Sequence, residues 1–359
     1  MKEGRAPGEP GNSRERGVTV HKVAIWGAGT MGRVHAGCYQ RSEEARVAYV
    51  IDQDPTKAQE LAATCGARAI GEPAAALLDP EVDVVDVCLP TYLHREAVEE
   101  AARAGKHVLC EKPAALSIDD AKAMLETCRA CGVKLGVAHV VRYFPEYETV
   151  HQMITSGELG QIGTVRLSRV GPFPRGWTDW YADETRSGGL LLDLSIHDFD
   201  FLRWCFGPVD HVYARKARND RPLEYALVVV RMKNGVIAHV EGSWAHPGPF
   251  SYKFEVCGSA GMVEYDSLKA RPLSVVTAPA PVSPRGGASA AGSGTPGGVA
   301  VPESPLKSRE PYLREIRDFL AYVRGESTPR VLPEDAVAAL EISLAATRSA
   351  LTGKVVSVS

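Results

Sequence analysis

The stretch VAIWGAGTMG, residues 23–32, decides the fold. A short apolar run predicts a buried strand, and a helical pattern follows it directly, so the glycines of a GxGxxG motif fall at a strand-to-helix turn. In that context Gly27 would make the tight turn, Gly29 would let a pyrophosphate approach the backbone, and Gly32 would let helix and strand pack closely. The stretch therefore indicates a dinucleotide site; the alternative is a glycine turn without a ligand.

Two further features support a dinucleotide at this turn. The helix that begins at Thr30 and Met31 would offer unpaired backbone N–H groups to phosphates. Asp52 ends the second predicted strand, where a carboxylate can accept hydrogen bonds from adenosine ribose hydroxyls and repel a 2′-phosphate. Its neighbours Gln53 and Asp54 bring no arginine. The pattern favours NAD over NADP, although Asp52 could instead be a turn-former.

Strand and helix patterns predict two different sheets. Up to Ala138, apolar runs alternate with helical patterns of about 10–15 residues, which is typical of βαβ units in a parallel sheet. Beyond Ala138 the segments are longer and strand-like, and MKNG (residues 232–235) is a hairpin signal. One amphipathic helix, from about Gly189 to Cys205, interrupts them. The predicted class is α/β: a doubly wound Rossmann domain followed by an α+β domain with a large, mostly antiparallel sheet.

Length and composition bound the domain organisation. The 359 residues suggest two domains. We expect a disordered tail over 1–20, a Rossmann domain over 21–138 and a substrate and oligomerisation domain over 139–359. Within the last, the Pro-, Gly-, Ala- and Ser-rich segment 278–305 is expected to be flexible. The 41 basic and 44 acidic residues give a net charge of −3, which argues against nucleic-acid or anionic-membrane partners.

Cysteine usage and the chain start indicate a reduced, cytoplasmic protein. The start has no apolar core of the kind found in secretory signals. The eight cysteines form no regular framework, and the pair Cys128 and Cys131 has no further ligands beside it. Because structural zinc needs four ligands, we expect no metal site.

A candidate chemical group follows the fifth predicted strand, at Glu111-Lys112-Pro113. Open α/β sheets bind ligands at the carboxyl ends of their strands. Lys112 could there donate to a substrate oxygen or, with a lowered pKa, transfer a proton. The alternative is an ordinary surface lysine.

A second candidate pair, Asp193 and His197, is spaced i, i+4 in GGLLLDLSIHDFDFLRW. On one helix the two side chains would share a face, and the carboxylate could orient the imidazole and raise its pKa. Taken alone, such a pair could equally be an ordinary helix hydrogen bond or cap.

Five motifs together resemble the Gfo/Idh/MocA family: GAGTMG, LPTYLH, AGKHVLCEKP, RYFPEY and GGLLLDLSIHDFD, in this order. The resemblance implies NAD(H) or NADP(H) bound across a Rossmann domain, and an open C-terminal sheet through which the chain forms a homodimer or homotetramer. It also implies that Lys112, Asp193 and His197 face the nicotinamide and a sugar or polyol carbon.

Further site residues follow from the same resemblance. It implies cofactor contacts at these positions, with Glu111 and Lys112 under the nicotinamide: Pro90, Thr91, His94, Glu111, Lys112 and Arg142. Arg142 and Tyr143 would approach from the domain junction, although His94 could be a helix residue without a ligand. Trp177, Asp179 and Trp180 suit a sugar site, because aromatic faces cover apolar sugar edges and carboxylates bind hydroxyls; the alternative is a packed loop.

The resulting functional hypothesis is an NAD-dependent oxidoreductase acting on a secondary alcohol of a cyclic polyol, sugar or sugar derivative. Lys112 would hold or polarise the oxygen, His197 would relay the proton, and Asp193 would set the ionisation of both. One alternative is a glycosidase or lyase that uses NAD transiently. Another is a dinucleotide-binding regulatory protein without catalysis.

Overall fold

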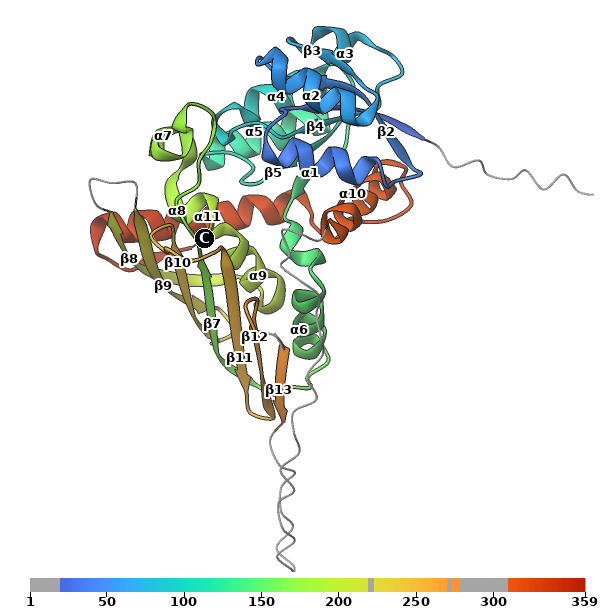
Figure 1. Cartoon of the computed structure of the whole chain (residues 1–359). Coiled ribbons are helices and arrows are strands. Elements are labelled where there is room, and N and C mark those ends of the chain that lie inside the picture. Colours follow the sequence, from blue (N-terminus) through green and yellow to red (C-terminus); the bar gives the residue numbers. More distant parts are fainter. Residues whose placement is uncertain (1–19, 219–222, 270–272, 278–308, 359) are drawn as a thin grey trace, which may run out of the picture.

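A computed structural model describes residues 20–218, 223–269, 273–277 and 309–358 (Figure 1). The expected tail, apart from Val20, and the low-complexity segment 278–305 lie outside the described residues. Figure 1 shows two sheets with their helices as two lobes, and α11 (Pro333–Thr352) running between them. This helix packs on both lobes, contacting α5 (Ile118–Ala130) on one side and β8 (Val209–Arg218) on the other.

The first lobe is a parallel six-stranded sheet in the order β3-β2-β1-β4-β5-β6. Its strands are β1 (His21–Trp26), β2 (Ala45–Ile51), β3 (Arg68–Ile70), β4 (Val84–Val87), β5 (His107–Glu111) and β6 (Leu135–Ala138). The helices between them are α1 (Thr30–Tyr39), α2 (Pro55–Cys65), α3 (Ala74–Leu78), α4 (His94–Arg103) and α5, with the short 3₁₀ turns η1 (Thr91–Leu93) and η2 (Val140–Tyr143). The predicted Rossmann-type sheet is confirmed.

Local sequence signals explain where these helices begin and end. Asp54 caps α2 by accepting from the N–H groups of Thr56 and Lys57, and Gly66 ends the helix in the left-handed conformation. Ser117 caps α5, because its hydroxyl accepts from Asp120 N at 3.1 Å.

The second lobe is an eight-stranded sheet in the order β13-β12-β11-β7-β10-β9-β8-β14. Its strands besides β8 are β7 (Ile162–Val170), β9 (Glu224–Met232), β10 (Ile237–Ser243), β11 (Ser251–Gly258), β12 (Gly261–Asp266), β13 (Leu273–Thr277) and β14 (Val356–Ser357). All its pairs are antiparallel except β7 with β10. The predicted mostly antiparallel sheet and the MKNG hairpin between β9 and β10 are confirmed; β13 and β14 were not predicted.

Two helices pack on this second sheet: α8 (Gly189–Asp193) contacts β9 and β10, and α11 contacts β8. The other helices of this part of the chain are α6 (Pro145–Thr155), α7 (Glu184–Ser187) and α9 (Ile196–Phe206), with η3 (Trp177–Ala182) before α7. Along β9 buried and exposed residues alternate, so the outer face carries Leu227 and Val229, which are 49% and 42% exposed. The chain returns to the first lobe at α10 (Glu310–Val323), which packs on α1.

The expected single helix from Gly189 to Cys205 is wrong. The chain forms α8 and α9, with a break at Leu194 and Ser195. Ser195 N bonds to Leu190 O, five residues back, and this wider turn shifts the helical register. Asp193 therefore ends one helix, His197 lies on the next, and the two do not share a regular i, i+4 face.

Candidate functional site

A cleft of about 730 Å³ opens at the carboxyl ends of β1, β2, β4 and β5. Glycine-turn residues line one part of it, and Lys112, Asp193 and the η3 segment line another. It thus joins the predicted dinucleotide turn to the predicted chemical group. Of the expected site residues, these line it: Gly27, Gly29, Thr30, Met31, Asp52, Pro90, Thr91, Glu111, Lys112, Trp177, Trp180 and Asp193.

The glycine turn is shaped to receive a ligand. Gly27 has φ +113°, and a Cβ there would collide with Cys88 O, so a side chain is excluded both by conformation and by space. A Cβ on Gly32 would collide with the Gly27 carbonyl, which accounts for the close packing of helix and strand. At Gly29, by contrast, nothing lies within 4 Å of an added Cβ. This open space at the start of α1 fits the phosphates of a dinucleotide.

Asp52 lies at the end of β2 and faces the same cleft. Its Oδ2 accepts from Ala28 N and its Oδ1 from Asp54 N, both at 2.8 Å. These bonds fix the carboxylate beside the glycine turn, where ribose hydroxyls would bind. Two cations also line the cleft but are neutralised, Arg33 by Glu60 at 2.9 Å and Lys57 by Asp54 at 3.3 Å. Reading only the neighbours of Asp52 in sequence missed both.

Lys112 and Asp193 meet across the two lobes. Lys112 Nζ donates to the Asp193 carbonyl at 2.8 Å and to Asp193 Oδ1 at 3.1 Å. The backbone N–H of Lys112 donates to Glu111 Oε2 at 3.1 Å. The turn after β5 is thus fixed both at the Lys112 backbone and through the Lys112 side chain. The structure therefore places an ammonium and a carboxylate in contact in the wall of the cleft.

His197 lies behind this pair rather than among the residues that line the cleft. Its Nδ1 is buried and has no hydrogen-bond partner among the described residues. Burial, and then the positive charges of Lys112, Arg169 and His139, hold the pKa of His197 well below its ordinary value. The expected raising effect of Asp193 is not among these causes, because that carboxylate pairs with Lys112. The imidazole is therefore neutral at physiological pH.

The η3 segment supplies aromatic rings to the cleft. Trp177 is 50% exposed, and Trp180 is buried and stacks on Tyr181 with ring centroids 3.9 Å apart. Asp179, with φ +50°, is exposed and is not among the lining residues. Tyr181 and Arg175 line the cleft, although sequence reasoning did not single them out. The sequence identified the segment but not which of its side chains turn inward.

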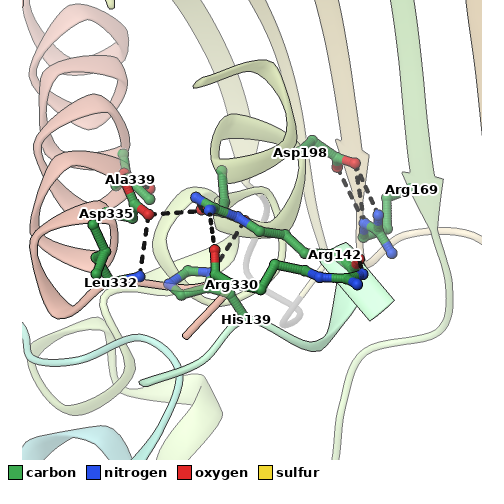
Figure 2. A network of polar contacts seen from close by, with 10 residues as sticks. His139, Arg142, Arg169, Asp198, Arg330, Leu332, Asp335 and Ala339 are labelled. Carbon is green, nitrogen blue, oxygen red and sulfur yellow. Dashed lines mark hydrogen bonds and ion pairs between the residues drawn. The ribbon is translucent and has the colours of Figure 1, made fainter. Parts of the chain in front are cut away.

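The expectation of a cofactor contact from Arg142 is not met by its geometry. Its guanidinium donates to both oxygens of Asp200, at 2.6 and 2.9 Å, and to Asp335 Oδ2 at 3.0 Å. Figure 2 shows Arg142 within this buried network, together with Arg330 and His139. Arg142 joins η2 to α9 and α11 and does not line the cleft.

Tyr143 and His94 also have structural partners. The Tyr143 hydroxyl donates to Asp318 at 2.7 Å, away from the cleft-lining set. The ring nitrogens of His94 lie 2.9 Å from Pro113 O and 2.8 Å from Leu89 O. His94 thereby ties together two turns that border the cleft, which is the alternative role considered for it.

Comparisons with known proteins agree on the family. Residues 21–139 match the model of an oxidoreductase family with an NAD-binding Rossmann fold, and residues 147–264 match the GFO/IDH/MocA C-terminal domain. The myo-inositol 2-dehydrogenase of Thermotoga maritima is 28% identical over 91% of this chain and 96% of its own length. The scyllo-inositol 2-dehydrogenase (NAD(+)) of Bacillus subtilis is 28% identical over 92% and 94%.

Solved structures give the same result. The enzyme GenD2 from gentamicin A biosynthesis, solved in complex with NAD, is 28% identical, with a TM-score of 0.83 over 95% of this chain and 97% of GenD2. The expectation of an NAD-binding oxidoreductase is confirmed. The glycine turn, the cleft and the two matched domains together make this chain a member of the Gfo/Idh/MocA family of oxidoreductases.

Proposed function

We propose that this chain is an NAD-dependent dehydrogenase that oxidises a secondary alcohol of a cyclic polyol, sugar or sugar derivative. The observation that carries the proposal is the Lys112–Asp193 pair in the cleft wall, with a neutral His197 behind it. The names of similar proteins support the substrate class, since they include inositol 2-dehydrogenases and a D-glucoside 3-dehydrogenase from Escherichia coli.

Each residue has a defined part in the proposed reaction. NAD, when bound, supplies the acceptor for the hydride. Lys112 donates a hydrogen bond from its ammonium to the substrate oxygen and stabilises negative charge as the hydroxyl proton leaves. His197 receives that proton by relay, because it does not itself line the cleft and its low pKa keeps it neutral and able to accept. Asp193 holds the Lys112 ammonium in place.

Substrate turnover tests this proposal. Purified protein is incubated with NAD⁺ and a panel of inositols, aldoses and alkyl glucosides, and NADH is followed by absorbance, with Lys112→Met as the inactive control. We expect net NADH formation with at least one cyclic polyol or sugar. Product formation without NADH would indicate transient use of the cofactor, and an entirely silent panel would contradict the proposed substrate class.

The proposal includes NAD rather than NADP, a homo-oligomer and a cytoplasmic location. Asp52 supports the first, because its carboxylate would repel a 2′-phosphate. All eight cysteines are free, which agrees with a reducing compartment. Among the described residues, no helix is long and apolar enough to cross a membrane.

The outer face of the second sheet supports assembly. Leu227, Val229, Tyr225 and Ile237 are each at least 36% exposed on the neighbouring strands β9 and β10. An apolar stripe on a sheet face is a typical protein–protein contact. Leu227→Lys should therefore reduce the mass measured by light scattering to that of a smaller species. Leu78→Lys, at an apolar residue 82% exposed on α3, should not change the mass. An unchanged mass in Leu227→Lys would place the interface elsewhere.

A further inference from the structure

A group of buried ionisable side chains lies beneath the Lys112 turn, outside the reaction described above. His35 on α1 is wholly buried, and its Nδ1 lies 2.9 Å from Asp86 Oδ2 on β4. Its other nitrogen, Nε2, lies 3.3 Å from Glu111 Oε1 at the end of β5, within ion-pair distance but without hydrogen-bond geometry. One imidazole thus lies between two carboxylates from neighbouring strands.

This arrangement leads directly to the proposed catalytic lysine. Glu111 Oε2 accepts from the backbone N–H of Lys112 at 3.1 Å, while Oε1 of the same carboxylate faces His35. The Lys112 ammonium in turn reaches Asp193. Glu111 itself lines the cleft, although it is only 6% exposed. The position of the Lys112 turn therefore depends on a carboxylate whose other oxygen contacts His35.

The surroundings of His35 favour its cationic form. Burial alone would lower the pKa of His35, but the Asp86 carboxylate and then the Cys88 sulfur overcome burial and hold it well above the ordinary value. From its own helix, Tyr39 donates to Asp86 Oδ2 at 2.9 Å.

From α10, Tyr312 and Glu315 face the same group. Burial and then the charge of Glu111 raise the pKa of both, to well above the ordinary value for Glu315. Glu315 also has no hydrogen-bond partner for either carboxylate oxygen among the described residues. Burial and the lack of partners both favour the protonated form of Glu315. The group contains one cation, His35, between two carboxylates, Asp86 and Glu111.

A metal ion does not explain this arrangement. His35, Asp86 and Cys88 form the one group of three potential ligands that the described part of the chain contains. His35 and Asp86 are in direct hydrogen-bond contact at 2.9 Å. Ligands about 2.0–2.3 Å from a tetrahedral zinc ion lie more than about 3 Å from one another. Burial raises the pKa of Cys88, so that sulfur stays a neutral thiol.

We propose that His35 is a positioning residue: as a buried cation it holds the Glu111 carboxylate, and through it the Lys112 turn, in the geometry that the reaction requires. The inference rests on the proposed function only for the identity of the reaction. Without the imidazolium, the carboxylates of Asp86 and Glu111 would lie buried on neighbouring strands with no positive charge between them. Glu111 would lose the contact at its Oε1, and its hold on the Lys112 N–H would weaken.

The experiment compares His35→Gln with Tyr39→Phe, which removes a second partner of Asp86 from the same site but leaves the cation. In His35→Gln we expect kcat to fall roughly tenfold or more, with the Kd of NAD⁺ at neutral pH changed less than about threefold. Tyr39→Phe should keep both kcat and the Kd of NAD⁺ within about threefold of the wild-type values. An unchanged kcat in His35→Gln, or an equal loss of kcat in Tyr39→Phe, would overturn the proposal.

A measurement on the wild-type protein does not depend on substrate or on the folding of a variant. In ¹⁵N-histidine NMR spectra, we expect both ring nitrogens of His35 to be protonated at pH 8, with the resonance assigned by its absence in a His35 variant or by through-bond correlation. A neutral imidazole at pH 7 would overturn the proposal even if an alcohol substrate is found. A silent substrate panel with a cationic His35 would instead count against the proposed function alone.

Discussion

Two histidines in the interior, His35 on α1 and His197 on α9, have opposite charge environments. His35 lies between the carboxylates of Asp86 and Glu111, whereas His197 faces the cations Lys112 and Arg169. Burial by itself lowers the pKa of both imidazoles, so the neighbouring charges account for the difference between them. The net result is a pKa held well above the ordinary value at His35 and well below it at His197.

The difference shows that burial alone does not decide whether a histidine carries a proton; the sign of the neighbouring charges does. As a cation, His35 can fix the position of the carboxylates that it contacts. As a neutral imidazole, His197 can accept a proton. Lys112 is central to the contrast, because its N–H contacts the carboxylate that His35 holds, and its ammonium lowers the pKa of His197.

The largest effect is expected from Lys112→Met. It removes the group that stabilises the substrate oxygen, so kcat should fall on the order of a hundredfold or more. It also removes a positive charge that faces His197, so the acidic limb of the residual rate should move to higher pH. NAD binding, measured by fluorescence titration, should persist because the phosphates bind at the glycine turn. Activity near the wild-type level would show that Lys112 is not catalytic.

Removing the base should have the next largest effect. In His197→Ala the rate should fall roughly tenfold or more, and its acidic limb should flatten because the titrating group is gone. Asp193→Asn leaves the Lys112 charge unbalanced, so the limb should move to lower pH, opposite to the shift in Lys112→Met. The measurement is the pH profile of kcat with a deuterated substrate that shows a primary isotope effect. A limb that stays unchanged in His197→Ala would leave Lys112 as the remaining base.

Local patterns in the sequence predicted much of this site. The glycine turn and the strand after which Lys112 lies depend on contiguous residues, so periodicity was sufficient to identify them. The break between α8 and α9 depends on tertiary packing instead: a Cβ on Gly242 of β10 would collide with the Ser195 hydroxyl. No local pattern contains that contact.

Arg142 shows the same limit for a site residue. Its partners Asp200 and Asp335 lie 58 and 193 residues further along the chain, and they keep its side chain out of the cleft. Arg33 lines the cleft unpredicted for a related reason, since folding and not adjacency in sequence brings it to the same cleft as Asp52. Long-range ion pairs decide which charged side chains face a ligand.

The free energy of unfolding should also differ with pH because of the two histidines, but this effect should be smaller than the effects on kcat. The folded-state pKa of His197 lies below that of the unfolded chain, so the unfolded state takes up a proton first as the pH falls. The contribution of His197 to the free energy of unfolding is therefore present above about pH 6.5 and declines below it, by at most about 1.4 kcal/mol per pH unit. The contribution of His35 has the opposite sign: it is complete below about pH 6.5 and is lost as the pH rises through its raised pKa.

Urea unfolding at pH values between 7 and 5.5 tests the contribution of His197 to the free energy of unfolding. His197→Asn should lose less stability over this interval than the wild type, because the position no longer titrates. His211→Asn, at an exposed histidine on β8, is the control and should follow the wild type. Parallel slopes for wild type and His197→Asn would show that the imidazole of His197 is not held neutral by the fold.

The smallest effect is expected at Asp52, a charge held by backbone N–H groups and not by an opposite charge. Asp52→Ala removes the proposed ribose acceptor and the repulsion of a 2′-phosphate, so the affinity for NAD should fall by roughly tenfold or less and its advantage over NADP should narrow. Arg33 and Lys57, paired with Glu60 and Asp54, line the same cleft as Asp52 and are the cations proposed to receive that phosphate. Glu60→Gln would free Arg33 without touching the ribose acceptor, so NADP should gain affinity in this variant while NAD does not. The measurement is a titration of NAD and NADP against the wild type and the two variants. If the wild type already prefers NADP, or if Asp52→Ala leaves the ratio of the two affinities unchanged, Asp52 does not select the cofactor.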